Sequence, residues 1–304
     1  MSRLVSPFPL LVIVGPTASG KSALALSLAQ KYDAEIVACD ALQVRKGLPL
    51  LTAKPTESET ALVPHHLIGV FGIDEPATAA RYAELADAAI SDIHSRGKRV
   101  ILCGGTGLYL RALCEGLVAT PPADPSLRAK LRSEAEQHGA ATLHTRLAVV
   151  DPDSAARIAP ADYVRIERAL EVFLLSGRTM TDWHRENRAE RAQGPRYHSQ
   201  QIGLDPGPAL LRTRILARTS QWLTQGLVDE VERCHRESGP LAFPPLGYEQ
   251  VLRFLRQEID EQTLIAEIVT KTAQYARRQR IWFRSEPGIR WFASADQVTD
   301  IGWE

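Results

Sequence analysis

The chain has 304 residues and a formal net charge of zero, from 36 basic and 36 acidic residues. This length suits one large α/β core or two smaller domains, and the balanced charge excludes a globally basic field that would indicate a nucleic-acid partner. No apolar run approaches the roughly 20 residues of a membrane-spanning helix, and Met1 to Pro9 is too short and proline-rich for a signal peptide. We therefore expect a cytoplasmic protein without a membrane partner.

The first predicted element is an apolar strand at residues 10–14, and it leads directly into a motif that fits G-x-x-x-x-G-K-S/T. In such a loop the backbone N–H groups surround phosphate oxygens, the lysine adds a positive charge, and the final hydroxyl can hold Mg²⁺. A chance match is the alternative, but the strand before the loop and the helix-forming residues 23–29 after it supply the required context. We predict a site for a diphosphate or triphosphate, formed by Gly15, Pro16, Thr17, Ala18, Ser19, Gly20, Lys21 and Ser22, with Ser22 as the metal ligand.

Three more apolar segments are predicted strands, at residues 35–39, 100–103 and 201–204. Helix-period stretches separate the first three strands, which is typical of a doubly wound parallel sheet with helices on both faces. Ligands of such sheets bind beyond the carboxyl ends of the strands, where the phosphate loop, Asp40 and the glycine-rich residues 104–107 all fall. The predicted fold is therefore an α/β, P-loop NTPase-like core with these three segments at one site.

The pattern changes after Gly116. Residues 120–125 are rich in turn formers, helical periodicity continues to about residue 175, and Gly177 ends it. A polar stretch at 182–200 leads back, helices resume from Pro208, and residues 261–284 are expected to form one long helix. We predict an all-helical insertion domain at 117–198 between two parts of the core, 1–116 and 199–304.

Beyond the phosphate loop, a set of short motifs resembles the tRNA dimethylallyltransferases over almost the whole chain: Asp40 with Gln43 and Val44, Thr52-Ala53-Lys54-Pro55, His65-His66-Leu67, Gly104-Gly105-Thr106-Gly107-Leu108-Tyr109, Arg168-Ala169-Leu170-Glu171-Val172, Tyr275-Ala276-Arg277-Arg278-Gln279 and Trp282-Phe283. The resemblance implies transfer of a dimethylallyl group from dimethylallyl diphosphate to N6 of the adenosine 3′-adjacent to the anticodon in tRNA, with release of diphosphate. We also expect the enzyme to use Mg²⁺ and to act as a monomer.

Adenine N6 is a poor nucleophile, because its lone pair is delocalised into the ring, so a carboxylate must accept its proton. Asp40 is the candidate base, and in the resembling family the equivalent aspartate contacts the amine. The alternative is that Asp40 caps the next element or holds Mg²⁺. Thr106 is expected to orient Asp40 or the amine, or else to cap the following helix. Charge that builds on the leaving diphosphate needs an arginine, either Arg214 or Arg218, unless both lie on a solvated helix face.

The resemblance also implies a set of RNA contacts, since the adenosine must leave the anticodon stack to reach an enclosed site. For Arg168 the alternative is an ion pair with Glu171. The chain departs from the family pattern at Ala41, Arg45 and Leu51, which puts the detail of the loop contacts in doubt. The expected RNA-binding residues are Asp40, Ala41, Leu42, Gln43, Thr106, Arg128, Val164, Arg165, Ile166, Glu167, Arg168, Arg278 and Gln279.

The histidine pair, the cysteines and the C-terminal aromatic residues could suggest a zinc site, disulfide bonds or base stacking, but the sequence favours none of these. His65 and His66 are adjacent, yet no Cys, Asp or Glu partner stands at metal-ligand spacing, so we expect no zinc site. The four cysteines are scattered and are expected to be reduced. Trp282 and Phe283 are expected to be core residues rather than base-stacking ones.

Three competing functions share the phosphate loop. An isopentenyltransferase for free adenine nucleotides would use the same Asp40 chemistry, a small-molecule kinase would bind ATP at the loop, and a nucleotide-dependent switch would leave Asp40 without a role. The helical insert with its arginines favours a macromolecular acceptor.

Overall fold

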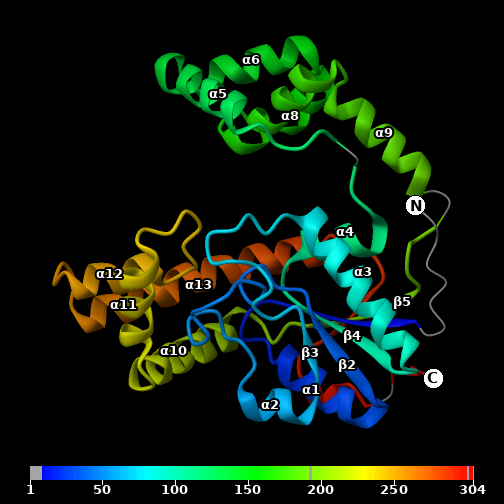
Figure 1. Ribbon diagram of the computed structural model, residues 1–304, viewed down its shortest axis with the longest axis vertical. Helices are drawn as coiled ribbons and strands as arrows, with labels where there is room; N and C mark the ends of the chain where they lie inside the picture. The colour runs from blue at the N-terminus through cyan, green and yellow to red at the C-terminus, as the bar shows by residue number, and fades with distance from the viewer. Residues whose placement is uncertain (1–8, 119, 192–193, 300, 304) are drawn as a thin grey trace. The chain divides into compact units, whose positions relative to one another are not determined.

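The computed structural model describes residues 9–118, 120–191, 194–299 and 301–303. The chain forms two compact units (Figure 1). The first combines Met1–Cys114 with Arg196–Glu304, and the second is Glu115–Pro195. Each unit has a hydrophobic core of its own.

The first unit is built on a six-stranded sheet in which every neighbouring pair is parallel. The strand order is β3-β2-β4-β1-β5-β6, so the α/β prediction is confirmed. Four strands lie where the sequence predicts them, within one or two residues at each end, whereas β3 and β6 were not predicted because they are only two and four residues long. The strands are β1 (Leu10–Val14), β2 (Ala34–Ala38), β3 (His65–His66), β4 (Arg99–Gly104), β5 (Ser199–Leu204) and β6 (Ile289–Phe292).

Alternate residues of the central strand pack against opposite layers of helices. Val12 and Val14 join a cluster with α3 (Ala79–Ser95) and α4 (Gly107–Glu115), whereas Leu11 and Ile13 pack with α1 (Lys21–Tyr32). Both faces of the strand are fully buried, which explains its unbroken apolar sequence. The phosphate loop, residues 15–20, connects the carboxyl end of this interior strand to α1.

The C-terminal part of the first unit adds four helices with a cluster of their own. Residues 261–284 form the single helix that the sequence predicts. Leu48 and Leu51, from the segment after β2, are buried in the same cluster. The helices are α10 (Pro208–Thr224), α11 (Leu227–Ser238), α12 (Tyr248–Leu255) and α13 (Glu261–Arg284), and the short α2 (Glu57–Leu62) and a 3₁₀ turn (Ala295–Gln297) complete this unit.

The second unit is helical throughout its described residues. Its α8 ends at Gly177, which has the left-handed φ of 69° and so fits the predicted stop. The polar stretch at 182–200 was not predicted to be helical, yet its residues 182–191 belong to helix α9. That helix is polar on nearly all sides, and so it lacks the apolar stripe that reveals a helix in sequence. The helices are α5 (Pro125–His138), α6 (Ala140–Val150), α7 (Pro152–Arg157), α8 (Tyr163–Ser176) and α9 (Met180–Arg191).

The two points where the chain leaves and rejoins the first unit are hydrogen-bonded to each other. Arg196 donates its backbone N–H to the Cys114 carbonyl at 2.9 Å. Its guanidinium donates to the Leu113 carbonyl at 2.9 Å and to Asp87 at 2.6 Å. In the described part of the chain, no helix is both long and apolar enough to span a bilayer.

Candidate active site

The two fixed glycines of the phosphate loop answer steric demands that the fold makes. A Cβ atom on Gly15, whose φ is 152°, would lie 2.4 Å from the Leu204 carbonyl oxygen of β5. Gly20 has a φ of 98° directly before α1 begins at Lys21, a conformation that L side chains rarely adopt. The loop can therefore pass close to β5 and bring the first N–H groups of α1 to a bound anion.

Lys21 lies within the loop, and its Nζ donates to the Pro16 carbonyl at 3.3 Å. Burial lowers the pKa of this ammonium, while the nearby Asp40 carboxylate acts in the opposite direction. The Ser19 hydroxyl is buried and has no hydrogen-bond partner among the described residues. A cationic group and an unsatisfied hydroxyl at one loop suit a phosphate oxygen.

A cavity lies beside the phosphate loop, and Ser22, whose side chain is exposed, is one of the residues that line it. Among the described residues there is no cluster of three or more His, Cys, Asp or Glu side chains that could hold a metal. Mg²⁺ usually retains several waters and takes its other ligands from one or two protein oxygens and from substrate phosphates. A single hydroxyl beside an anion cradle therefore fits Mg²⁺ that arrives with a diphosphate.

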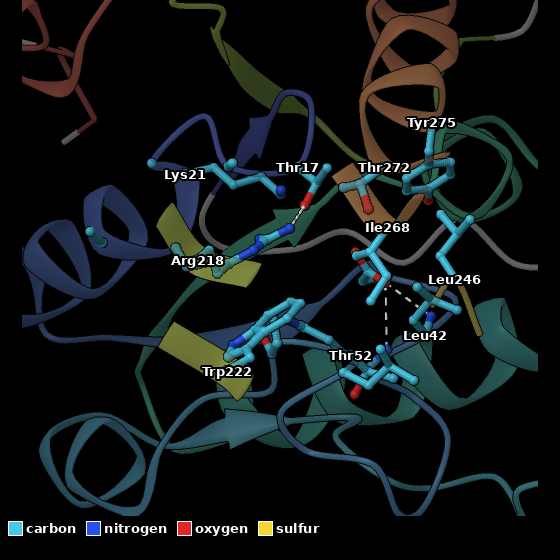
Figure 2. A pocket seen from close by; sticks show the side chains of 18 residues that line it. Thr17, Lys21, Leu42, Thr52, Arg218, Trp222, Leu246, Ile268, Thr272 and Tyr275 are labelled. Carbon is cyan, nitrogen blue, oxygen red and sulfur yellow. Dashed lines mark hydrogen bonds between the residues drawn. The ribbon is translucent and has the colours of Figure 1, made fainter. Parts of the chain in front are cut away.

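The two candidate arginines of α10 lie differently. Arg218 lines the cavity, donates from Nη2 to the Thr17 hydroxyl at 3.1 Å, and stacks on Trp222 with its Cζ 4.6 Å from the ring centroid (Figure 2). Arg214 donates from Nη1 to the carbonyls of Ala18 and Ser19 and does not line the cavity. The prediction that either arginine faces the diphosphate is therefore kept for Arg218 alone, and we assign Arg214 to bracing the loop.

Asp40 follows β2 and lines the cavity, and the described residues contribute no other carboxylate to that lining. Its Oδ1 accepts from the Leu42 N–H at 2.9 Å, so one carboxylate oxygen fixes the turn that follows. Among the described residues no donor bonds to Oδ2. The turn role and the role of a base are thus compatible, since they use different oxygens.

Thr106 fixes the backbone next to Asp40. Its Oγ1 accepts from the Ala41 N–H at 2.9 Å, and its own N–H donates to the Cys39 carbonyl at 3.1 Å. The alternative in which its hydroxyl caps α4 is wrong, because that hydroxyl is bonded across to the β2 end. A Cβ on Gly104 would lie 2.0 Å from the Cys39 carbonyl oxygen, so a glycine is needed for this close approach.

The cavity has a volume of about 220 Å³ and changes character along its length. Figure 2 shows Thr17, Lys21 and Arg218 at one side, and Leu42, Leu246 and Ile268 with Tyr275 at another. This volume is below the roughly 300–1,000 Å³ of typical ligand pockets, and it suits a small group with one charged and one apolar end. Its other lining residues include Ser22, Gln43, Leu51, Thr52, Ala53, Trp222 and Thr272.

Nine lining residues were not among the predicted site residues: Ala23, Leu51, Thr52, Ala53, Trp222, Leu246, Ile268, Thr272 and Tyr275. Burial, together with the charge of Asp40, raises the pKa of the Tyr275 hydroxyl well above its ordinary value, which keeps it a neutral donor. A usable signal was present in the spacing. Trp222 stands four residues after Arg218, and Ile268, Thr272 and Tyr275 are spaced by four and three, so each set shares one helix face.

The other residues of the first unit that were expected to contact RNA differ in position: some line the cavity, one is exposed, and one is buried. Leu42 and Gln43 line the cavity, and Gln43 also donates to the Ala53 carbonyl at 2.6 Å. Arg278 is exposed, with its Cζ 5.7 Å from the Tyr275 ring centroid. Gln279 is buried and bonded to two backbone groups, which does not fit a side-chain contact with RNA.

In the second unit Arg128 and Arg168 are both paired with one buried carboxylate. Glu171 is 0% exposed and accepts from Arg128 at 2.9 Å on each oxygen, and it also accepts from Arg168. The ion pair weighed as the alternative for Arg168 therefore exists, although it is buried at the glutamate. Both arginines keep part of their side chains exposed.

The expected RNA-contact residues at 164–168 differ in exposure. The side chains of Val164 and Arg165 are exposed, whereas Ile166 is 0% exposed in the core of the second unit. Glu167 is 5% exposed and accepts from the Tyr163 hydroxyl at 2.8 Å. The side chains of Ile166 and Glu167 therefore pack inside the second unit, and their burial does not fit a side-chain contact with RNA.

Two of the three departures from the family pattern, Arg45 and Leu51, have local explanations. Arg45 donates to the Ile73 carbonyl at 2.7 Å and to the Glu75 carbonyl at 3.0 Å, so it anchors a neighbouring loop. Leu51 is buried in the C-terminal cluster, and its N–H donates to the buried Glu230 at 3.0 Å. The positive φ values of this loop fall on Gly47, Leu48 and Ala53 rather than on Leu51.

The two adjacent histidines serve the edge of the sheet. His65 lies on β3 and its Nδ1 is 2.8 Å from the Val63 carbonyl. The His66 Nε2 lies 2.6 Å from Glu35, which also accepts from Arg96. The cysteines are all free thiols, and Cys39, Cys103 and Cys114 are buried. Phe283 is a core residue, and Trp282 packs against the same cluster.

Comparison with known proteins gives consistent results. The IPP transferase family model matches residues 43–286. A protein of Anaeromyxobacter sp. (strain Fw109-5) named tRNA dimethylallyltransferase is 45% identical over 294 residues, which is 96% of this chain and 97% of that protein. One of the same name from Sorangium cellulosum (strain So ce56) is 44% identical over 92% of this chain and 89% of its own length.

Two solved structures are also similar. A full-length tRNA isopentenylpyrophosphate transferase from Bacillus halodurans has a TM-score of 0.66 and 32% identity, over 93% of this chain and 89% of its own. A eukaryotic dimethylallyltransferase, captured in crystallographic snapshots acting on tRNA, has a TM-score of 0.77 and 26% identity, over 95% of this chain and 75% of its own.

Proposed function

The chain belongs to the IPP transferase family, and from this premise we propose that it transfers a dimethylallyl group from dimethylallyl diphosphate to N6 of the adenosine 3′-adjacent to the anticodon in tRNA. Support comes from relatives of 45% identity named tRNA dimethylallyltransferase and from the cavity described above. We further propose that it acts as a cytoplasmic monomer with Mg²⁺. The observation that carries the proposal is that Asp40 and the phosphate loop line one cavity.

The leaving group is the first requirement of this reaction. As the bond between C1 of the dimethylallyl group and the diphosphate oxygen breaks, its electron pair passes to the diphosphate. Loop N–H groups, Lys21 and Arg218 are prearranged donors for that charge, and they need no reorganisation when the bond breaks. Mg²⁺ at Ser22 would supply a further positive charge to the diphosphate when bound.

The acceptor is the second requirement. N6 of adenine attacks C1 from the side of Asp40, and the C–N bond forms as the carboxylate takes the N6 proton. The free Oδ2 of Asp40 is suited to this, because Oδ1 is already engaged by the Leu42 N–H. Thr106 holds the Ala41 backbone, and through it the orientation of Asp40. The apolar wall with Leu246 and Ile268 suits the methyl groups of the donor and excludes water.

The exposed positions of the second unit support a macromolecular acceptor. Arg128, Arg165 and Arg168 all belong to this unit, and each keeps part of its side chain exposed. We propose that they contact the phosphates of the anticodon stem-loop, together with Arg278 of the first unit. Arginine suits such contacts because its planar fork matches phosphate oxygens.

The test is the variant Asp40→Asn, in which the amide oxygen still accepts from the Leu42 N–H while the base is lost. We expect the single-turnover rate with an anticodon stem-loop RNA to fall about 10²- to 10⁴-fold, with unchanged affinity for pyrophosphate. Asp33→Asn is the matched control, since Asp33 is exposed and its left-handed backbone tolerates asparagine. Unchanged turnover in Asp40→Asn would reject the base.

The acceptor is identified by mass analysis of the products from three substrates: the stem-loop RNA, the same RNA with guanosine at the modified position, and AMP. The proposal requires a dimethylallyl adduct on the first RNA and none on the second. Alkylation of AMP alone would instead identify a nucleotide isopentenyltransferase, and ATP consumption coupled to product formation would identify a kinase.

A further inference from the structure

Gln279 is a buried polar residue on α13 whose amide oxygen and amide nitrogen each bond to a backbone group. It is 5% exposed. Its Oε1 accepts from the Thr17 N–H at 2.8 Å, and its Nε2 donates to the Gly105 carbonyl at 2.9 Å. Because one partner is a backbone donor and the other a backbone acceptor, only one orientation of the amide satisfies both.

The two partners belong to the two halves of the proposed reaction site. Thr17 lies in the phosphate loop, where its hydroxyl accepts from Arg218. Gly105 directly precedes Thr106, whose hydroxyl accepts from the Ala41 N–H beside Asp40. One side-chain amide thus connects the residues that hold the diphosphate to the residues that hold the base, although the three segments are far apart in sequence.

The glycine-rich segment at 104–107 is shaped to receive this helix. A Cβ on Gly105 would lie 2.1 Å from Gln279 Nε2, and a Cβ on Gly107 would lie 1.9 Å from Trp282 Nε1. Gln279 and Trp282 are three residues apart on one face of α13. Gly105 and Gly107 therefore allow α13 to pack closely against the backbone of residues 104–107. This close packing is independent evidence that the distance between α13 and this segment is constrained.

We propose that Gln279 is a positioning residue for the alkyl transfer: it fixes the phosphate loop against the residues 104–107 and so sets the separation of C1 of the bound donor from the acceptor amine. This inference rests on the proposed function. It gives Gln279 a different role from the RNA contact expected from its motif. An amide is required, because a carboxylate has no donor for Gly105 and an apolar side chain has neither group.

The experiment compares Gln279→Met, which has similar length and makes neither hydrogen bond, with Gln279→Glu, which keeps an acceptor for Thr17. Gln274→Met is the matched control, because Gln274 is exposed on the same helix. Each protein is assayed for single-turnover transfer to a stem-loop RNA at saturating substrates. Separate titrations measure Kd for that RNA and for inorganic pyrophosphate, and thermal unfolding measures Tm.

We expect Gln279→Met to lower the single-turnover rate about 100-fold, with both Kd values within about 3-fold of the wild type, because a misplacement of about 1 Å has that effect on rate. Gln279→Glu should also be slow. If Gln279→Met is unfolded at the assay temperature, the same comparison made with Gln279→Glu decides.

Three results would overturn the inference. One is a rate equal to that of the control, and the second is a loss of RNA affinity by the same factor as the rate. The third is a loss of pyrophosphate affinity whose effect on rate disappears at saturation. A wild-type enzyme that alkylates no RNA would instead reject the proposed function, so the two failures are distinguishable.

Discussion

Arg218 offers the most direct test of how the enzyme stabilises its leaving group. Its Nη2 donates to the Thr17 hydroxyl, but its Nε is buried and has no partner among the described residues. A buried cationic N–H without an acceptor is costly, so we expect a diphosphate oxygen to accept from it in the complex. Burial lowers the pKa of Arg218 to about 10, which leaves the guanidinium charged at neutral pH.

The expected effect follows from this geometry. Arg218→Gln removes one charge-assisted donor aimed at the oxygen on which charge develops, and such a loss costs about 2.7–4 kcal/mol, or 10²- to 10³-fold in kcat. Arg218→Lys keeps the charge but not the planar group that stacks on Trp222, so we expect a smaller loss.

The assay is steady-state transfer to a stem-loop RNA with dimethylallyl diphosphate varied, so that kcat and KM are separated. Arg212→Gln is the control, since Arg212 is exposed on the same helix. A kcat for Arg218→Gln within about 3-fold of the wild type would show that the arginine does not act on the transition state, and our reading of its unpaired Nε would be wrong.

Two further variants test the surrounding structure. Arg96 and His66 hold the pKa of Glu35 at about 2, below its ordinary 4.5, so this carboxylate adds stability that is complete above about pH 4.5 and is lost as the pH falls through 2. The Tm of Glu35→Gln should therefore lie below that of the wild type at about pH 6, and the gap should close toward pH 2 in thermal unfolding; a gap that does not change with pH would contradict this. Glu171→Gln should lower the free energy of unfolding of the second unit by about 2–3 kcal/mol in urea titrations, less than for a fully buried pair because the paired arginines are partly exposed, and it should weaken RNA binding. Unchanged RNA affinity in a folded Glu171→Gln protein would argue against an RNA role for Arg128 and Arg168, the two arginines that pair with Glu171.

What the sequence could predict was mainly local. The phosphate loop was recognisable because its constraints fall on consecutive residues: Gly15 avoids Leu204, and Gly20 adopts a positive φ before Lys21. The long helix at 261–284 was recognisable from its unbroken periodicity. Helix α9 was not, because a polar helix has no periodic apolar signal.

The remaining site residues depend on contacts between distant segments. Trp222 and Tyr275 reach the cavity from α10 and α13, and helical spacing shows that residues share a face without showing what that face meets. Gln279 illustrates the same point, since its partners at 17 and 105 are set by the packing of α13 on the loops. The motif around it suggested RNA, whereas the fold gives its side chain an internal use.

The hydrogen bond between Arg196 and Cys114 has a consequence for modularity. About eighty residues are inserted between two positions that already touch, so their removal would leave only a short gap for a linker to close, and the entropy of closing a loop grows slowly with its length. The first unit could thus tolerate a second unit that is lengthened, shortened or exchanged. Under the proposed role of the second unit in RNA binding, recognition of the acceptor could diversify in evolution while the chemistry stayed intact.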